Sequence, residues 1–407
     1  MTSQSPPHNP RLRGIPRTVW ALGIVSMFMD VSSEMIHSVL PLFLTSVLGA
    51  SAVFVGLIEG VAEAIALISR TLSGPLSDWL GKRKALAMAG YGLATLTKPL
   101  FAMANSIGLV FTARFLDRIG KGIRGAPRDA LVADVTPPEI RGAAFGLRQS
   151  LDTVGALLGP LLAVVIMVAT AASYRAVFWI SVVPAILAVV ILAVAVHERA
   201  DRPAGSRRRF IRYRDVLSLG SAYWMVVVFG SVFTLARFSE AFLLLRAGSV
   251  GVSASMIPFM MVLMNLVYSL TAYPAGRLSD RMGRTGLVAV GLAVLILADL
   301  VLASAVNAWL VAAGVGLWGL HLGLTQGLLS AMVADTARED MRGTAFSLFS
   351  LAGGLAMLVA SVTAGWLWEA FGAPATFFAG AAFAVAALAA YLSLRRRFAL
   401  GARVDTR

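Results

Sequence analysis

Long apolar segments recur along this chain, and they constrain its fold more than any other feature. Each runs for about 20 residues, the length that a helix needs to cross the hydrocarbon core of a bilayer. Hydrophobic residues make up 58% of the 407 positions and charged residues only 14%, which excludes an ordinary soluble protein. Strands of a membrane barrel would be shorter, with alternating polarity. The chain is therefore predicted to be an all-α polytopic membrane protein.

Hydropathy divides the chain into twelve predicted transmembrane helices in two groups of six. They cover residues 18–44, 51–73, 85–104, 107–133, 142–171, 173–196, 216–246, 252–276, 285–304, 307–334, 342–369 and 374–394. One long polar connection separates the two groups. The predicted domains are a tail (1–17), a six-helix bundle (18–196), a basic linker (197–215), a second six-helix bundle (216–397) and a tail (398–407).

Basic residues occur in alternate loops, which predicts how the chain is oriented. They gather at 82–84, along 199–214 and at 395–397, whereas the loops around 105–107 and 305–308 carry no Lys or Arg. Cytosolic loops of membrane proteins are enriched in these residues. Both tails and the linker are therefore predicted to be cytosolic, in the inner membrane of a bacterium. The net charge of +14 then needs no nucleic-acid partner.

Two sequence blocks repeat about 200 residues apart. GPLSDWLGKRK at 74–84 returns as GRLSDRMGRTG at 276–286, and ADVTPPEIRGAAF at 133–145 returns as ADTAREDMRGTAF at 334–346. Repeated halves are typical of secondary transporters, which hold their substrate near the membrane midplane between the halves. The repeat therefore predicts two pseudo-symmetric bundles.

These blocks resemble the motifs of the major facilitator superfamily. Its loop motif matches Gly74, Asp78, Gly81 and Lys82, with a second copy at Asp280, Arg281 and Gly283, and its fourth-helix motif matches Arg114 and Asp134. The resemblance implies that these residues form a conformational latch. Gly155, Gly159 and Pro160 resemble the fifth-helix motif of the proton-coupled antiporters of that family. That motif implies export driven by the proton gradient, with no cofactor.

The predicted fourth helix carries seven charges, at a depth where charges are costly. They are Arg114, Asp117, Arg118, Lys121, Arg124, Arg128 and Asp129. At 100° per residue all seven fall on one arc of roughly 140°. The arc is expected to face water or other charged helices. The acids and bases of helices 1, 2 and 5 are the expected partners.

Four intramembrane acids are candidates for proton coupling: Asp30, Glu34, Asp117 and Asp152. Burial raises the pKa of a carboxyl group and a nearby cation lowers it, so a change of conformation can load and release a proton. Two alternatives stay open for Asp30 and Glu34. They could form a static ion-pair network with Arg118 or Lys121, or contact the substrate directly.

The remaining candidates are assigned to a charge network or to the substrate. They are Glu63, Arg118, Lys121, Arg124, Arg148, Arg237 and Glu240. Glu59 is expected to be hydrated, and Lys98 and Arg128 to extend towards the membrane surface. The second half holds few such groups, and Phe349 and Gly353 stand at its equivalents of Arg148 and Asp152. The coupling charges are therefore expected in the first half.

The sequence favours a monomeric, proton-coupled antiporter that exports a small amphipathic or drug-like molecule. The main alternative is a transporter of organic anions, which an unpaired intramembrane arginine would indicate. Divalent-metal efflux through Asp30, Glu34 and His37 is disfavoured, because they spread over about 10 Å of helix. A non-transporting sensor is also disfavoured, and no constellation of enzyme residues is present.

Overall fold

All twelve predicted spans form helices in the computed structural model, which describes residues 14–196, 219–282, 284–337 and 341–404. The first half contains α1 (Arg17–His37), α3 (Ala52–Leu80), α4 (Arg83–Met103), α5 (Ile107–Val135), α6 (Arg141–Ala169) and α7 (Tyr174–Ala195). The second contains α9 (Ser221–Leu235), α10 (Ala241–Ser249), α11 (Pro258–Met282), α12 (Arg284–Ala303), α13 (Ala308–Thr336), α14 (Arg342–Phe371) and α15 (Ala373–Val404). The predicted linker 197–215 lies outside the described residues.

Two spans are broken, which hydropathy alone did not indicate. After α1 the first span continues through α2 (Leu40–Leu42) and a π-helical turn (Phe43–Val47), next to Pro41, which removes one backbone donor. The seventh span is interrupted over 236–240, between α9 and α10. Unwound backbone at mid-membrane is tolerated where it is buried in protein or lines an aqueous cavity.

Nine of the described helical segments are long and apolar enough to cross a membrane. The charged helices α4 and α5 and the broken α9–α10 span do not meet that test on composition and length. Within the bundles α4 packs against α5 and α7, α5 against α3 and α4, and α9 against α14, α15 and α13. The charges of α4 and α5 and the break between α9 and α10 are therefore the departures from a plain apolar bundle.

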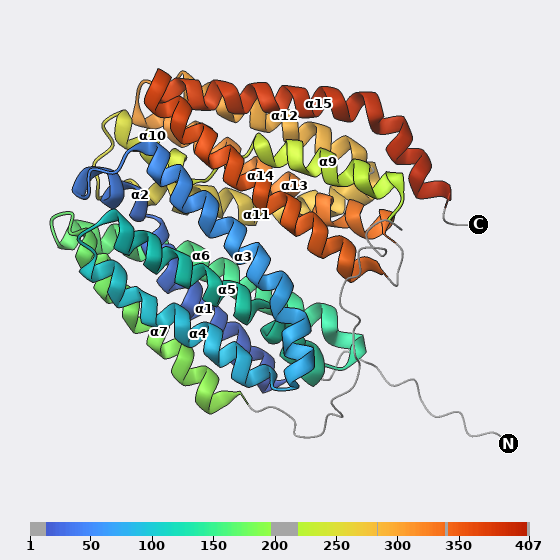
Figure 1. Ribbon diagram of the computed structural model, residues 1–407, viewed down its shortest axis with the longest axis horizontal. Coiled ribbons are helices and arrows are strands. Elements are labelled where there is room, and N and C mark those ends of the chain that lie inside the picture. Colours follow the sequence, from blue (N-terminus) through green and yellow to red (C-terminus); the bar gives the residue numbers. More distant parts are fainter. Residues whose placement is uncertain (1–13, 197–218, 283, 338–340, 405–407) are drawn as a thin grey trace.

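The two halves form separate bundles that meet along α3–α14 and α6–α11. Small residues allow the first contact: a Cβ added at Gly60 would lie 2.9 Å from Leu358 Cα, and one at Gly354 would lie 3.2 Å from Ala64 Cα. In Figure 1 the bundles come together where α2 and α10 lie and diverge towards the right of the view. We call the α2–α10 side the joined end, and the opposite side, with Gly81 and Arg141, the basic end.

The apolar core follows the same division. One cluster of buried side chains crosses between the halves at the joined end, where Phe43 and Leu44 belong with Phe242 and Leu244. A second cluster, which includes Tyr91, Leu131 and Leu192, is confined to the first half. The halves thus share a core only towards the joined end.

Candidate functional site

The charged face of α5 points into the first half, as the helix geometry predicted. Arg114, Asp117, Arg118 and Arg124 are each less than 5% exposed, whereas the apolar residues of the opposite face are partly exposed. α5 packs against α3, α4, α1 and α6. Those helices supply its counter-charges, and we call the resulting set of ion pairs the charge network.

Two ion pairs of the charge network lie towards the joined end and are buried. Arg114 donates to Glu59 at 2.6 Å, and Lys98 donates to Asp117 at 2.8 Å. His37 lies 3.6 Å from Glu59 and 3.4 Å from Glu34. Glu59 is 1% exposed and Lys98 also 1%, so the expectations that Glu59 is hydrated and that Lys98 extends to the surface were wrong.

Near the middle of α5 the contacts are longer. Arg118 Nη2 lies 3.4 Å from Glu63, and Arg124 Nη2 lies 3.9 Å from Asp30 while its guanidinium covers the ring of Tyr91. Glu34 pairs with His37 rather than with Arg118 or Lys121. Asp30 keeps 26% of its side chain exposed. Asp30 therefore forms the loosest ion pair of the charge network.

Four groups cluster nearer the basic end. Arg148 contacts Asp152 at 2.9 Å and Asp129 at 3.5 Å, and Arg128 contacts Asp129 at 3.1 Å and Asp152 at 3.8 Å. Arg70 of α3 adds a contact to Asp129 at 3.5 Å. Arg128 also donates to Ser26 of α1, so it turns inward and does not extend to the surface. Two acids here share three arginines.

Lys121 is the exception within the charge network. It lies in the middle of α5 and is exposed. Within the part of the chain that the structure describes, no carboxylate lies within 4.0 Å of its ammonium. Glu63, Glu34 and Asp30 are its acidic neighbours at longer range.

The glycines of the predicted antiporter motif pack directly on α1. A Cβ at Gly155 would lie 2.6 Å from Met27 O and 3.0 Å from Asp30 Cβ, and one at Gly159 would lie 2.7 Å from Glu34 Cβ. Only glycine permits this approach. Pro160 continues within α6. The motif therefore sets the position of the two acids that the sequence favoured for proton coupling.

The second half presents Arg237 and Glu240 in the break between α9 and α10. Both are partly buried, and Arg237 lies over the ring of Phe233, 5.8 Å from its centroid. Glu240 is within electrostatic range of His37, Glu34 and Glu63 of the other half. Among the described residues neither side chain forms an ion pair within 4.0 Å.

Two further titratable groups of the second half, Asp299 and His321, are fully buried near the break. Both carboxyl oxygens of Asp299 lack a hydrogen-bond partner, and Asp299 Oδ2 lies 2.7 Å from the position that a Cβ at Gly380 would take. His321 Nδ1 lies 2.7 Å from Gly291 O.

At the basic end, Asp134 pairs with Arg83 at 2.5 Å. The predicted partner Lys82 is exposed, and the side chain of Asp78, at the centre of the predicted latch, lies outside the description. Gly81 ends α3 with φ of 64°, a conformation that favours glycine. Arg114 is twenty residues from Asp134 on one helix, about 30 Å away, and cannot share a cluster with it.

The second copy of the loop motif falls partly outside the description. Asp280 and Arg281 lie in the last turns of α11, and Gly283 lies outside the described residues. In the described part of the chain no group of three His, Asp or Glu side chains could hold a metal ion.

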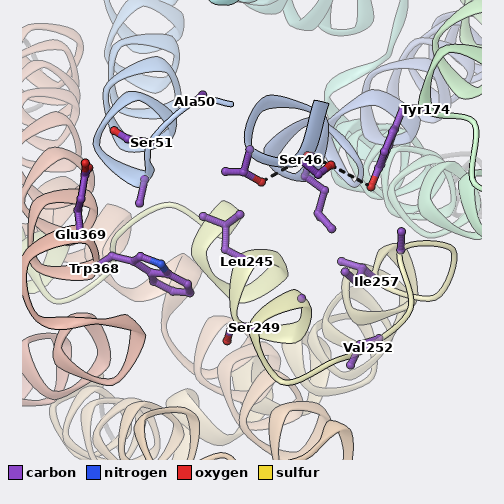
Figure 2. A pocket seen from close by; sticks show the side chains of 15 residues that line it. Ser46, Ala50, Ser51, Tyr174, Leu245, Ser249, Val252, Ile257, Trp368 and Glu369 are labelled. Carbon is purple, nitrogen blue, oxygen red and sulfur yellow. Dashed lines mark hydrogen bonds between the residues drawn. The ribbon is translucent and has the colours of Figure 1, made fainter. Parts of the chain in front are cut away.

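One pocket that the sequence did not predict opens at the joined end. It has a volume of about 580 Å³, and Figure 2 shows Tyr174 and Ser46 on one side and Trp368 and Glu369 on the other. The Ser46 hydroxyl donates to Tyr174 Oη at 3.4 Å. Its lining includes none of the residues of the charge network. The pocket is therefore separate from the charge network.

Comparison with known proteins identifies the family. The sequence matches the profile of the Major Facilitator Superfamily over residues 22–248 and 236–405. It is 32% identical over 369 residues to an uncharacterized MFS-type transporter of Methanocaldococcus jannaschii, covering 89% of this chain and 91% of the relative.

Solved structures share the fold. A peptide transporter of the POT type superimposes with a TM-score of 0.79 at 14% identity, covering 96% of this chain and 97% of the other. A bacterial homologue of the human lysosomal transporter Spinster, in an inward-facing and occupied conformation, also gives 0.79, at 15% identity and with 96% and 98% covered.

Proposed function

We propose that this chain, which belongs to the Major Facilitator Superfamily of membrane transporters, is a proton-coupled antiporter. It exports a small amphipathic or drug-like molecule by alternating access. The proton gradient is its energy source, and it works as a monomer without a cofactor in the bacterial inner membrane. The positive-inside pattern orients the basic end, both tails and the linker towards the cytosol.

The arrangement of the halves supports alternating access. Their shared apolar core lies at the joined end, and the bundles diverge towards the basic end (Figure 1). With the basic end cytosolic, the halves are joined on the side of the membrane that faces away from the cytosol. Opening that side requires that the α3–α14 and α6–α11 contacts separate and that the core shared at the joined end divides between the halves.

One observation carries the proton coupling: among the ion pairs of the charge network, that of Asp30 is the longest. Its nearest cation is 3.9 Å away and a quarter of its side chain is exposed, whereas Glu59 and Asp117 are sealed in short, buried pairs. A carboxylate that is partly hydrated can exchange a proton without breaking a strong ion pair. Gly155 holds the Asp30 backbone against α6, so movement between α1 and α6 changes the surroundings of this acid.

The test is transport in proteoliposomes under an imposed pH gradient, with cationic drugs and organic anions screened in parallel. The parent is expected to move at least one class against its gradient. Asp30→Asn should abolish accumulation driven by the pH gradient but keep exchange of labelled for unlabelled substrate. Accumulation by Asp30→Asn at the parental level would overturn the assignment of the proton to this residue.

A further inference from the structure

Lys121 stands at the centre of a charged helix, and no carboxylate of the described residues lies within 4.0 Å of its ammonium. It is fourteen residues from each end of α5 (Ile107–Val135), which places it at the depth where transporters of this architecture hold their substrates. It is exposed. A lysine that only balanced the charge network would be expected to lie against an acid, as Lys98 lies against Asp117.

Arg237 is the matching cation of the other half. It lies close to the midpoint of the seventh span, in the segment where α9 has ended and α10 has not begun. Broken helices at this depth commonly form the substrate sites of secondary transporters. No carboxylate within the described residues reaches it at 4.0 Å, even though Glu240 is three positions away.

The two cations are linked through shared neighbours. Glu34 and Glu63 are within electrostatic range of Lys121 on one side and of Glu240 on the other, and Glu240 in turn is in range of Arg237. Glu34 and Glu63 already have the partners His37 and Arg118. Among the described residues of this region, Lys121, Arg237 and Glu240 form no ion pair within 4.0 Å.

We propose that the exported molecule carries an acidic group, a carboxylate, phosphate or sulfonate, which Lys121 and Arg237 bind from opposite halves. The proposal rests on the proposed transport function and specifies its substrate class. Arg237 presents a planar fork that suits two oxygens, and Lys121 presents a point charge that can follow the group as the halves move. The anion supplies the close counter-charge that Lys121 and Arg237 lack within 4.0 Å among the described residues.

This assignment differs from the arginines that the sequence favoured for an anionic substrate. Arg118 contacts Glu63 at 3.4 Å, and Arg148 contacts Asp152 at 2.9 Å. An anion at either arginine would have to displace a carboxylate of the protein. Lys121 and Arg237 offer their charges without that competition.

The test is direct binding to the purified protein, measured by calorimetry at low ionic strength. The probes are a panel of aromatic and aliphatic carboxylates, phosphates and sulfonates, each compared with its neutral amide or ester. The variants are Lys121→Gln, Arg237→Gln and the charge-preserving Lys121→Arg. Arg17→Gln is the matched control, because Arg17 is an exposed cation at the start of α1.

We expect at least one acid to bind the parent more tightly than its neutral analogue. Lys121→Gln and Arg237→Gln should each weaken that acid by at least tenfold, while Lys121→Arg and Arg17→Gln bind it as the parent does. Unchanged melting temperatures would show that the variants are folded. The proposal is overturned if no acid is preferred over its analogue, or if Lys121→Gln and Arg17→Gln behave alike.

Measuring acid binding and gradient-driven transport separately distinguishes the anion site from the antiporter function. Acid binding that depends on Lys121, without transport under a pH gradient, would support the anion site and contradict the antiporter. Gradient-driven export restricted to cations, with no acid bound, would support the antiporter and overturn the anion site.

Discussion

The two halves of this protein share a fold but not an electrostatic design. In the first half, α5 carries eight charges, and all of them except Lys121 pair with groups on α1, α3, α4 and α6 or with each other. In the second half the equivalents of Arg148 and Asp152 are Phe349 and Gly353. The second bundle therefore forms without the equivalents of these two charges.

The largest effect is expected where the charge network is most deeply buried. Glu59→Gln leaves Arg114 without its partner in a site where both side chains are at most 2% exposed. An uncompensated buried charge costs about 3–5 kcal/mol, so the variant should lose most of its folded yield and melt at a much lower temperature. Thermal unfolding of the detergent-purified protein measures the change.

The double variant Glu59→Gln with Arg114→Met is the control. Removing both charges should recover part of the lost stability, because a neutral pair leaves no isolated ion. Equal destabilisation by the single and double variants would show that the ion pair itself holds α3 against α5.

The next largest effect is expected from substitutions at the contact between α3 and α14. A Cβ at Gly56 would lie 2.1 Å from Ser361 O, whereas one at Gly146 would meet nothing within 4 Å. Gly56→Ala should push α3 from α14 and populate the state open at the joined end. Gly146→Ala should be neutral or stabilising, as alanine favours helix.

Spin labels can report this shift, because the chain has no cysteine of its own. Labels on cysteines placed at the exposed positions Phe54 and Trp366 should move apart in Gly56→Ala, and labels at Leu76 and Leu351 should approach. Unchanged distances in both pairs would show that the α3–α14 contact accommodates the added methyl group without separating the halves.

A smaller loss of stability is expected from breaking the Arg83–Asp134 ion pair at the basic end. Arg83 and Asp134 are each 19% exposed, and partly exposed ion pairs contribute about 0.2–1 kcal/mol. Arg83→Gln should therefore lower the melting temperature only slightly, and high salt should reduce the difference. Lys82→Gln is the matched variant, and a larger effect from Lys82 would restore the originally predicted partner.

The smallest effect is expected in the second half. Asp299 accepts no hydrogen bond in the described structure, so Asp299→Asn removes no contact. Its free energy of unfolding should change by less than about 0.5 kcal/mol, the lower edge of what one hydrogen bond contributes. A large loss in the same thermal assay would reveal a partner of Asp299 in another conformation.

Much of the fold followed from the sequence, because membrane spans and the face of a helix depend on local pattern. All twelve spans and the inward direction of the α5 charges were predicted and are confirmed. The Arg83–Asp134 ion pair and the burial of Glu59 were missed. Both depend on how neighbouring helices are staggered. The unpaired state of Lys121 depends on every other pairing and could not be read from one helix.

Proton movement measured for one acid of each half tests the central claim most directly. A pH-sensitive dye inside proteoliposomes would report protons moved per substrate molecule in Asp30→Asn and Asp299→Asn. We predict that Asp30→Asn moves substrate by exchange with no associated protons, and that Asp299→Asn keeps the parental ratio. Loss of proton movement in Asp299→Asn, with coupling intact in Asp30→Asn, would contradict the placement of coupling in the first half.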